Sequence, residues 1–410
     1  MPPHDLPADR LVRPVLGRAT RAATAAAALP LVLGAVAAQR LGGRAQRAAA
    51  RLPERPPAVP QRVEPATSAT EAAARVLAVL PSTSATRGLA RARGGFPDWP
   101  LMLAAARPEL ALLGYRYPRV FRHLVVPGED AEPIAALVAR QPSPAAPAVV
   151  VVHGAMTSKH FDYVRRAAVR AYRLGFHVLA LDLRGFGVTA LTSEAPTSLG
   201  WAEGGDVLAA GRWLRERGAT SVGAVGFSLG GAAVLCAARR AGEGELDGGV
   251  LAFSPPADVG RALDALSARP PLRDPLFGTW LTLHAAATTR MRAAGYGHEP
   301  YSLREAVELV SAPWYGLGVD ELARRASPAT WIADVRVPVV AVHAVDDVVI
   351  PVAHARELAV RAAGNAHVHV VIRPAGGHAA FDLVDPTWTT GVERAWLGAL
   401  ARWPGPGGAA

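Results

Sequence analysis

The stretch Gly226-Phe227-Ser228-Leu229-Gly230 decides the fold that we expect, because of what lies on either side of it. Residues 221–225 before it are short, apolar and typical of a buried strand. Residues 231–240 after it are rich in alanine and end in two arginines, as in a helix with cations at its C-terminus. The pattern therefore predicts a strand, a sharp glycine-flanked turn and a helix, with the Ser228 hydroxyl at the tip of the turn.

Strand-like and helical segments alternate on both sides of this turn. Strands are expected at 120–126, 134–139, 149–152, 177–183, 221–227, 249–253, 338–345 and 367–372. Helices are expected at 161–174, 206–217, 230–240, 352–363 and 387–402. The first two strands flank a turn and form an antiparallel pair, whereas the others alternate with helices as in right-handed βαβ units. The fold class is therefore α/β, with a mostly parallel, doubly wound sheet.

Two regions fall outside this alternation. Residues 255–334 are mostly helical, with scattered proline, tryptophan and tyrosine, and are predicted to be a helical cap inserted between two strands. The apolar character of this cap favours an acyl or lipid-like substrate over a charged one. Residues 1–118 are expected to be an N-terminal helical extension with a proline-rich linker at 53–70, followed by the main domain at 119–403.

The charge of the chain is concentrated near its N-terminus. The 410 residues carry a net charge of +10, and residues 1–94 hold 14 arginines and 5 acidic residues. The rest of the chain is therefore almost neutral, which makes it a poor surface for nucleic acid, and we expect no nucleic-acid partner. The basic N-terminal segment has two interpretations: it contacts anionic lipid, or it is simply solvated.

An uncharged stretch of alanine and leucine at residues 22–38, flanked by arginines, has three interpretations. A membrane-spanning or membrane-surface helix would be short, and its alanines would contribute little insertion energy. A signal peptide ending at Ala35-Val36-Ala37 would follow an unusually long region that contains Asp5 and Asp9. The third interpretation is an alanine-rich helix lying on the protein. We expect a cytoplasmic or membrane-associated protein rather than a secreted one.

Ser228 requires two partners if it is to act as a nucleophile. A serine hydroxyl needs a base within hydrogen-bond reach, and that base needs an orienting carboxylate. In doubly wound hydrolases these follow the serine in the order acid, then histidine. His378 is the expected base, because it follows the strand at 367–372 and two glycines let its loop bend back toward Ser228. The other histidines considered fall on strands or helices and are expected to be structural.

Two adjacent carboxylates, Asp346 and Asp347, compete for the orienting role, since both follow the strand at 338–345. In the pattern D-x-x-V-P the acid stands four residues before proline, which selects Asp347 over Asp346 because Pro351 is that proline. Asp346 is then expected to be a turn or capping residue. In a further alternative, both acids serve only the turn.

An oxyanion hole needs two backbone N–H donors. The residue directly after the nucleophile, Leu229, is expected to supply one of them. The second is expected from the loop after the strand at 149–152, with Ala155 as the first choice and Met156 as the next. His153 is expected to brace this loop without taking part in proton transfer. Because His-Gly is a common dipeptide after a strand, the loop also has a purely structural interpretation.

Several of these stretches together resemble the α/β-hydrolase superfamily: 149–158, 184–187, 226–231, the Asp346-Asp347 turn and 376–378. Within it, the chain is most similar to the YheT-like esterases, which include membrane-anchored abhydrolase-domain proteins. Those proteins tend to read A-x-D-D-P and G-G-H-x-G-F, from which Val348 and Ala380 depart. The resemblance covers residues 119–403 and implies an α/β-hydrolase fold. Some relatives carry an N-terminal membrane anchor.

The expected function is that of a serine hydrolase that cleaves carboxylic esters through an acyl-enzyme intermediate, with a small-molecule ester or a lipid-like substrate. Ser228 is the expected nucleophile, His378 the base and Asp347 the residue that orients the base. No cofactor and no metal are expected, and a single cysteine, Cys236, excludes an internal disulfide. The alternatives are thioester or amide cleavage, acyl transfer or haloperoxidase-type activity on the same triad, and a non-catalytic, membrane-tethered binding module.

Overall fold

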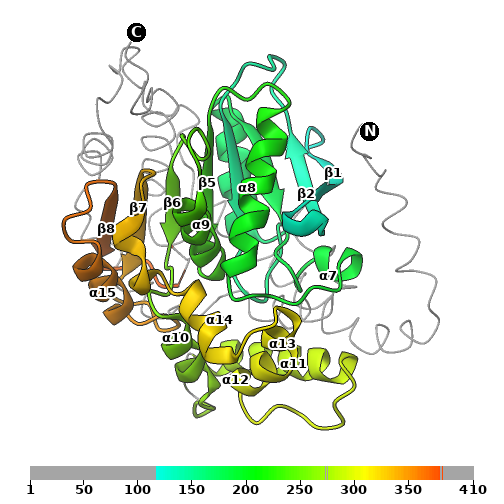
Figure 1. Ribbon diagram of the computed structural model, residues 1–410, viewed down its shortest axis with the longest axis vertical. Coiled ribbons are helices and arrows are strands. Elements are labelled where there is room, and N and C mark those ends of the chain that lie inside the picture. The colour runs from blue at the N-terminus through cyan, green and yellow to red at the C-terminus, as the bar shows by residue number, and fades with distance from the viewer. Residues whose placement is uncertain (1–116, 273, 275, 379–380, 382–410) are drawn as a thin grey trace, which may run out of the picture.

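The computed structural model describes residues 117–378, except 273 and 275, together with residue 381. Its centre is a single eight-stranded sheet in the order β1-β2-β4-β3-β5-β6-β7-β8 (Figure 1). The strands are β1 (Arg122–Pro127), β2 (Pro133–Ala139), β3 (Ala148–Val152), β4 (His177–Leu181), β5 (Val222–Phe227), β6 (Val250–Phe253), β7 (Val339–Ala344) and β8 (Val368–Arg373).

The sheet confirms the predicted fold class. Strands β1 and β2 form an antiparallel pair, β2 pairs antiparallel with β4, and every pair from β4 through β3 to β8 is parallel. Strands β3, β4, β5, β6 and β7 are buried along their whole length, which explains their continuous apolar sequences. The chain order reverses at β3, which lies between β4 and β5, and ligands of such sheets bind at this type of reversal.

Helices surround the sheet as the alternating sequence predicted. Helices α8 and α9 pack against each other in front of the sheet in Figure 1, and α6 packs against β3 and β4. The main helices between strands are α6 (Asp162–Arg173), α7 (Thr189–Thr192), α8 (Trp201–Arg215), α9 (Leu229–Arg240) and α15 (Ala353–Arg361). A short η2 turn (Glu129–Ala131) joins β1 to β2.

Helix α8 begins five residues earlier than the predicted start at 206, and the two glycines in this added part do not break it. Gly204 instead permits close packing of α8 on α9, since a Cβ at this position would lie 2.8 Å from the Cβ of Cys236. Helix propensity is therefore overridden by helix–helix contact at this position. The four-residue helix α7 was not predicted, because it is too short to show a helical period.

The chain between β6 and β7 is helical, as predicted for residues 255–334. It forms α10 (Val259–Ser267), α11 (Phe277–Ala293), α12 (Leu303–Ala306), η3 (Val307–Ser311), α13 (Ala312–Trp314), α14 (Val319–Ala326), η4 (Pro328–Thr330) and η5 (Ile332–Asp334). Helices α10–α14 gather at one end of the sheet in Figure 1. Buried side chains from α10, α11 and α14, among them Leu263, Met291 and Leu322, form a cluster separate from the sheet core. That this segment caps a substrate pocket stays a prediction.

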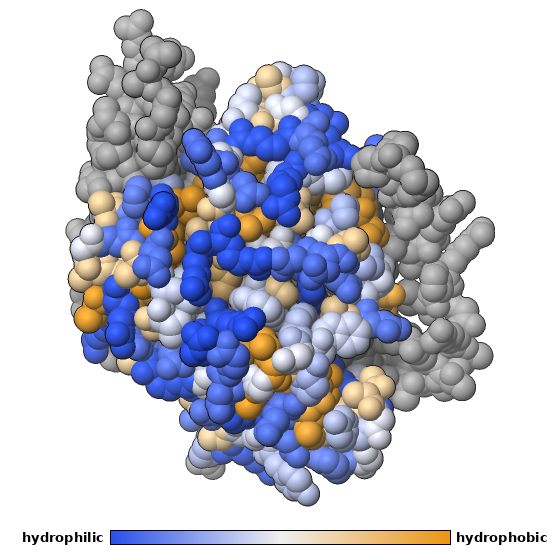
Figure 2. Space-filling view, in the orientation of Figure 1, coloured by the Kyte–Doolittle hydropathy of each residue, from blue (hydrophilic) through white to orange (hydrophobic). Residues whose placement is uncertain are grey.

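The surface in the view of Figure 2 is mainly hydrophilic, with hydrophobic patches toward the end of the molecule where α10–α14 lie. Large hydrophobic side chains exposed in this segment are Leu272, Tyr301 and Trp314. In the part of the chain that the structure describes, no helix is long and apolar enough to cross a membrane.

Several predictions concern residues outside the described range. They are the helix at 22–38, the linker at 53–70, the boundaries of the N-terminal extension at 1–118 and the final helix at 387–402. These remain predictions from the sequence.

Candidate active site

Ser228 lies at the sharp turn between β5 and α9, in a backbone conformation that L-residues rarely adopt. Its φ and ψ angles are 54° and −117°. The flanking glycines are required by space, because a Cβ at Gly226 would collide with the carbonyl oxygen of Gly230, and one at Gly230 would collide with that of His153. Backbone strain of this kind is concentrated at functional sites. Here the strained turn places Ser228 between the end of the strand and the start of the helix.

The structure brings the three residues predicted for catalysis into one line of hydrogen bonds. The Nε2 atom of His378 lies 2.8 Å from Oγ of Ser228. On the other side of the ring, Nδ1 of His378 lies 2.9 Å from Oδ2 of Asp347. An ionised carboxylate can only accept, so Nδ1 carries a proton and Nε2 is free to accept the proton of the serine hydroxyl. This tautomer is the one that a general base requires.

Asp347 is buried and surrounded by donors. Its Oδ1 accepts hydrogen bonds from the backbone N–H groups of Val349 and Ile350, both at 2.9 Å. Burial by itself would raise the pKa of this carboxyl, but the attraction of His378 and its hydrogen bond, together with His343, hold that pKa below its usual value. Asp347 therefore remains ionised at neutral pH.

A second imidazole also contacts this carboxylate. The Nε2 atom of His343 lies 3.4 Å from Oδ2 of Asp347 and 2.7 Å from the carbonyl oxygen of Ile350. Burial lowers the pKa of His343, so the ring is neutral, with its proton on Nε2. This neighbour was missed in the sequence, where His343 was assigned a structural role at the end of its strand; only its position four residues before Asp347 hinted at the contact.

Asp346 points to a different partner. Its Oδ1 accepts hydrogen bonds from the backbone N–H groups of Gly376 at 2.9 Å and Gly377 at 2.8 Å. Of the two adjacent carboxylates, the structure therefore places Asp347 at the imidazole of His378 and Asp346 at the backbone of the loop that carries it. The sequence pattern had selected the same residue for the orienting role.

The loop predicted to complete an oxyanion hole lies against the nucleophile. A Cβ at Gly154 would lie 3.2 Å from the Cβ of Ser228, so residues 153–156 pass directly beside it. The N–H of Gly154 already donates to the hydroxyl of Tyr163 at 3.0 Å, which leaves Ala155 and Met156 as the candidates in this loop. Leu229 is the first residue of α9, so its N–H has no acceptor in the helix ladder. The roles of Leu229 and Ala155 stay predictions.

His153 braces this loop, as expected. Its Nδ1 lies 2.6 Å from the carbonyl oxygen of Gly154, and its Nε2 accepts a hydrogen bond from the N–H of Leu183 at 2.9 Å. Burial lowers the pKa of His153, although Asp182 lies nearby. Both ring nitrogens are occupied, so this histidine is not a free base.

A buried ion pair holds the far end of the same loop. The ammonium of Lys159 contacts Oδ2 of Asp182. The backbone N–H of Lys159 donates a hydrogen bond to Oδ1 of the same carboxylate at 2.7 Å. Both side chains are fully buried, and the N–H of Val188 also donates to Oδ2 of Asp182 at 2.7 Å. The pair ties the candidate oxyanion loop to the segment after β4. This ion pair was not predicted. The signal in the sequence was that Lys159 is the single lysine in a chain that otherwise uses arginine.

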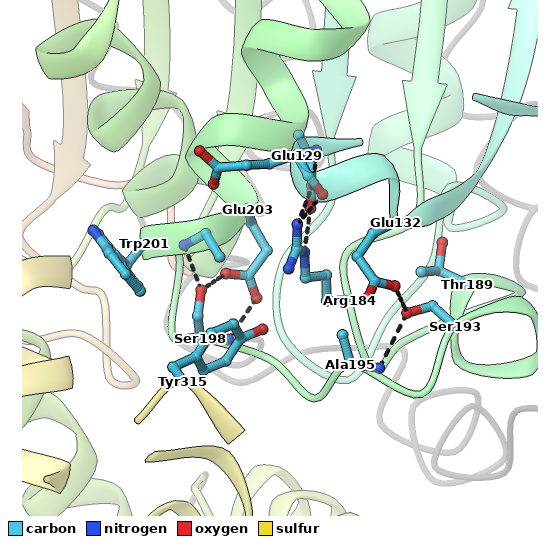
Figure 3. A network of polar contacts seen from close by, with 12 residues as sticks. Glu129, Glu132, Arg184, Thr189, Ser193, Ala195, Ser198, Trp201, Glu203 and Tyr315 are labelled. Atoms are coloured by element: carbon cyan, nitrogen blue, oxygen red, sulfur yellow. Dashed lines mark hydrogen bonds and ion pairs between the residues drawn. The ribbon is translucent and has the colours of Figure 1, made fainter. Parts of the chain in front are cut away.

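Two more buried carboxylates fix the segment that follows β4. Asp206 of α8 forms a two-pronged pair with Arg184, with distances of 2.8 Å from Nε and 2.7 Å from a terminal nitrogen. Glu203 accepts a hydrogen bond from the N–H group of Ser198 at 3.0 Å (Figure 3). It also accepts one from the N–H group of Gly200 at 3.1 Å. All of these groups have hydrogen-bond partners within the protein, so we assign a structural role to both carboxylates.

In the described residues, no group of histidine, cysteine, aspartate or glutamate is arranged to hold a metal ion.

The chain can now be compared with known proteins. The family model of the alpha/beta hydrolase family matches residues 149–391, which is more than half of the chain. The chain belongs to the alpha/beta hydrolase family. The matched range begins in β3 and extends beyond His378, so it contains all three residues of the hydrogen-bonded line.

Several solved structures are similar to this alpha/beta hydrolase at low sequence identity. The esterase Pf2001 of Pyrococcus furiosus is 18% identical, with 70% of this chain and 93% of that chain covered and a TM-score of 0.49. Est1E of Butyrivibrio proteoclasticus is 13% identical, with 66% and 96% covered and a TM-score of 0.44. An acylaminoacyl peptidase of Pyrococcus horikoshii is 16% identical, with 66% and 40% covered and a TM-score of 0.45. Comparison with curated proteins gives no match.

Proposed function

We propose that this alpha/beta hydrolase cleaves carboxylic esters through an acyl-enzyme formed on Ser228. The observation that carries the proposal is the continuous line of hydrogen bonds from Ser228 through His378 to Asp347, with distances of 2.8 and 2.9 Å. A serine hydroxyl in such a line is activated, whereas an isolated one is a weak nucleophile. Membership of the family supports hydrolase chemistry in general, and the ester is our specific choice of substrate.

In the first half of the reaction, Oγ of Ser228 attacks the ester carbonyl carbon while its proton moves to Nε2 of His378. Asp347 accepts the hydrogen bond from Nδ1 and stabilises the imidazolium that forms. The negative charge that develops on the carbonyl oxygen is held by the backbone N–H groups of Leu229 and Ala155. The tetrahedral intermediate then expels the alcohol, which takes the proton from Nε2, and an acyl-serine remains.

In the second half, a water molecule replaces the alcohol. His378 removes a proton from the water as the oxygen attacks the acyl carbon, and a second tetrahedral intermediate forms in the same oxyanion site. Its collapse returns the proton from Nε2 to Oγ of Ser228 and releases the carboxylic acid. The enzyme regains its starting state without an external oxidant or reductant.

The segment between β6 and β7 supports a lipid-like substrate. Its helices gather at one end of the sheet (Figure 1), and the exposed large hydrophobic side chains Leu272, Tyr301 and Trp314 lie in this segment. Ser228 directly follows the carboxyl end of β5, and α10 follows the parallel neighbour β6, so the cap begins on the same side of the sheet as the nucleophile. An acyl chain between cap and sheet would bury apolar surface.

The substrate class is tested by comparing kcat/KM for an ester, a thioester and an amide with the same acyl group. The ester is expected to be the best of the three, and each activity is expected to disappear in Ser228→Ala. A preference for the amide or thioester would leave the acyl-enzyme in place but change the substrate class. Acyl transfer would appear as a second ester product when an alcohol is added.

We also propose that the N-terminal segment attaches the enzyme to a membrane. Residues 22–38 are uncharged and flanked by arginines, a composition compatible with a helix at an anionic lipid surface. Full-length protein should sediment with vesicles that contain phosphatidylserine, whereas a variant beginning near Arg119 should not. Equal recovery of both forms in the supernatant would contradict this proposal.

A further inference from the structure

Two adjacent carboxylates hold the same loop in two different ways. Asp347 accepts a hydrogen bond from the imidazole of His378 at 2.9 Å. Asp346, one residue earlier, accepts hydrogen bonds from the backbone N–H groups of Gly376 at 2.9 Å and Gly377 at 2.8 Å. These amides stand two residues and one residue before His378. One carboxylate thus fixes the side chain, and its neighbour fixes the backbone from which that side chain extends.

The loop that carries His378 depends on these bonds, because the sheet ends before it. Strands β7 and β8 are joined by backbone hydrogen bonds, and the last of these runs from the N–H of Val345 to the carbonyl oxygen of Arg373 at 2.8 Å. Within the described residues, no acceptor other than Asp346 binds the N–H groups of Gly376 and Gly377. Gly377 has a φ of +54°, a left-handed conformation that glycine adopts readily and that the two bonds help to select.

Side-chain packing also limits the loop. A Cβ at Gly376 would collide with the ring of Phe381, and it would lie 3.1 Å from the Cβ of Ala344. Phe381 and Ala344 thus pack closely on the backbone of Gly376. The carboxylate of Asp346 holds the loop toward the sheet edge. A charged acceptor bonded to two adjacent amides is stronger and more directional than a neutral one.

We propose that Asp346 is a positioning residue, whose carboxylate sets the loop at 376–378 so that His378 reaches Ser228 and Asp347 at once. The two hydrogen bonds of His378 require its Cα to be placed accurately, because both ring nitrogens are engaged. A small shift of the loop would lengthen the contact of His378 to Ser228 or its contact to Asp347. The effect of Asp346 on catalysis rests on the proposed ester hydrolysis, whereas its effect on the geometry of His378 does not.

Three variants separate this role from a general contribution to stability. Asp346→Ala removes the acceptor, and Asp346→Asn removes the charge but keeps one oxygen that can accept from both amides. Asp247→Ala is the matched control, since Asp247 also accepts a backbone hydrogen bond, from Val222 at 2.8 Å, and pairs with Arg215. Val222 begins β5 and Ser228 follows its other end, so the control carboxylate lies away from the reacting atoms.

The kinetic readout is kcat and KM for an ester substrate, with the rate of labelling by a fluorophosphonate. Asp346→Ala should lower kcat and the labelling rate by about 10- to 100-fold, because small misplacements of a catalytic group cost rates of this size. KM should change by less than about twofold, Asp346→Asn should regain most of the activity, and Asp247→Ala should match the wild type. A wild-type kcat in Asp346→Ala, or equal losses in Asp346→Ala and Asp247→Ala, would overturn the proposal.

A second readout does not depend on catalysis. The Nδ1 proton shared by His378 and Asp347 should give a low-field ¹H NMR signal that is absent in Asp347→Asn. Asp346→Ala should shift or broaden that signal, and Asp346→Asn should keep it. An unchanged signal in Asp346→Ala would overturn the positioning role even if the enzyme had no esterase activity. Should Asp346→Ala fail to fold, Asp346→Ser, whose shorter side chain cannot bridge both amides, carries the same prediction.

Discussion

The imidazole of His378 lies 2.8 Å from the hydroxyl of Ser228, although 150 positions separate the two residues in the chain. The contact arises because β5 and β7 run parallel on either side of β6, and β8 follows as the next parallel strand. The loops after these strands therefore open on one edge of the sheet. The nucleophile follows β5, the carboxylate follows β7 and the histidine follows β8, so the topology itself assembles the line of hydrogen bonds.

Asp347→Asn should lower kcat by about 10³- to 10⁴-fold with little change in KM. The amide cannot stabilise an imidazolium, and it can donate a hydrogen bond that favours the wrong tautomer of His378. Steady-state hydrolysis of a chromogenic ester measures the effect, with Asp247→Asn as the control because Asp247 is a carboxylate at the far end of β5 from Ser228. Retention of more than a tenth of the wild-type kcat by Asp347→Asn would exclude it as the orienting acid.

The buried pair of Lys159 and Asp182 should show strong coupling in a double-mutant cycle. Lys159→Met should lower the free energy of unfolding by about 3–5 kcal/mol, because Asp182 is left buried without its counter-charge. The double variant Lys159→Met/Asp182→Asn should be more stable than the sum of the single effects by about 0.5–3 kcal/mol. Denaturant unfolding of the four proteins measures this, and strictly additive effects would contradict the assignment.

Stability should decrease on mild acidification, in part through His354. Burial, followed by the charge of Arg261, lowers the pKa of this α15 side chain from 6.5 to about 4, so the folded state favours the neutral ring. The unfolded chain binds a proton near pH 6.5 and the folded protein does not. The contribution of His354 is therefore complete above pH 6.5 and is lost as the pH falls toward 4.

His354→Gln tests this dependence. Its thermal unfolding midpoint should fall less than that of the wild type between pH 7 and pH 5, because glutamine has no charge to acquire. The comparison is made at each pH in the same buffer series. Parallel curves for the two proteins would show that His354 does not contribute to the acid sensitivity.

Gly230→Ala should disrupt the turn that carries Ser228. The added methyl group would collide with the carbonyl oxygens of His153 and Val152, which are backbone atoms and cannot rotate away. We expect a loss of about 1–3 kcal/mol in the free energy of unfolding and a low residual activity. Gly297→Ala is the control, since nothing lies within 4 Å of a Cβ there. Equal stability and activity of the two variants would contradict the crowding at the turn.

The sequence predicted those parts of the fold that depend on local composition. Continuous apolar runs predicted β3 and the other buried strands, and the glycine-flanked serine predicted the turn before α9, because in both cases the signal lies within a few residues. Helix α8 was predicted to start too late, since the reason for Gly204 is its contact with Cys236 of α9, which is distant in sequence.

The candidate site was predictable to the extent that each member follows a strand. Ser228, Asp347 and His378 were identified because their loops succeed recognisable strands in the order that hydrolases use. Three contacts were not identified from the sequence. They are the hydrogen bonds that Asp346 accepts from Gly376 and Gly377, the contact of His343 with Asp347, and the Lys159–Asp182 pair. The contacts of Asp346 and of the Lys159–Asp182 pair join loops that follow different strands, which only the sheet places side by side. The contact of His343 with Asp347 depends on the turn at the end of β7.

The most direct test of the central claim is covalent labelling of the full-length protein by a fluorophosphonate, followed by mass spectrometry of the modified peptide. The probe reacts with a serine only when a neighbouring base activates it. We predict a single modification on Ser228 of the wild type and none in Ser228→Ala of equal stability. A folded wild type that remains unlabelled, or labelling that persists in Ser228→Ala, would contradict the claim that Ser228 is an activated nucleophile.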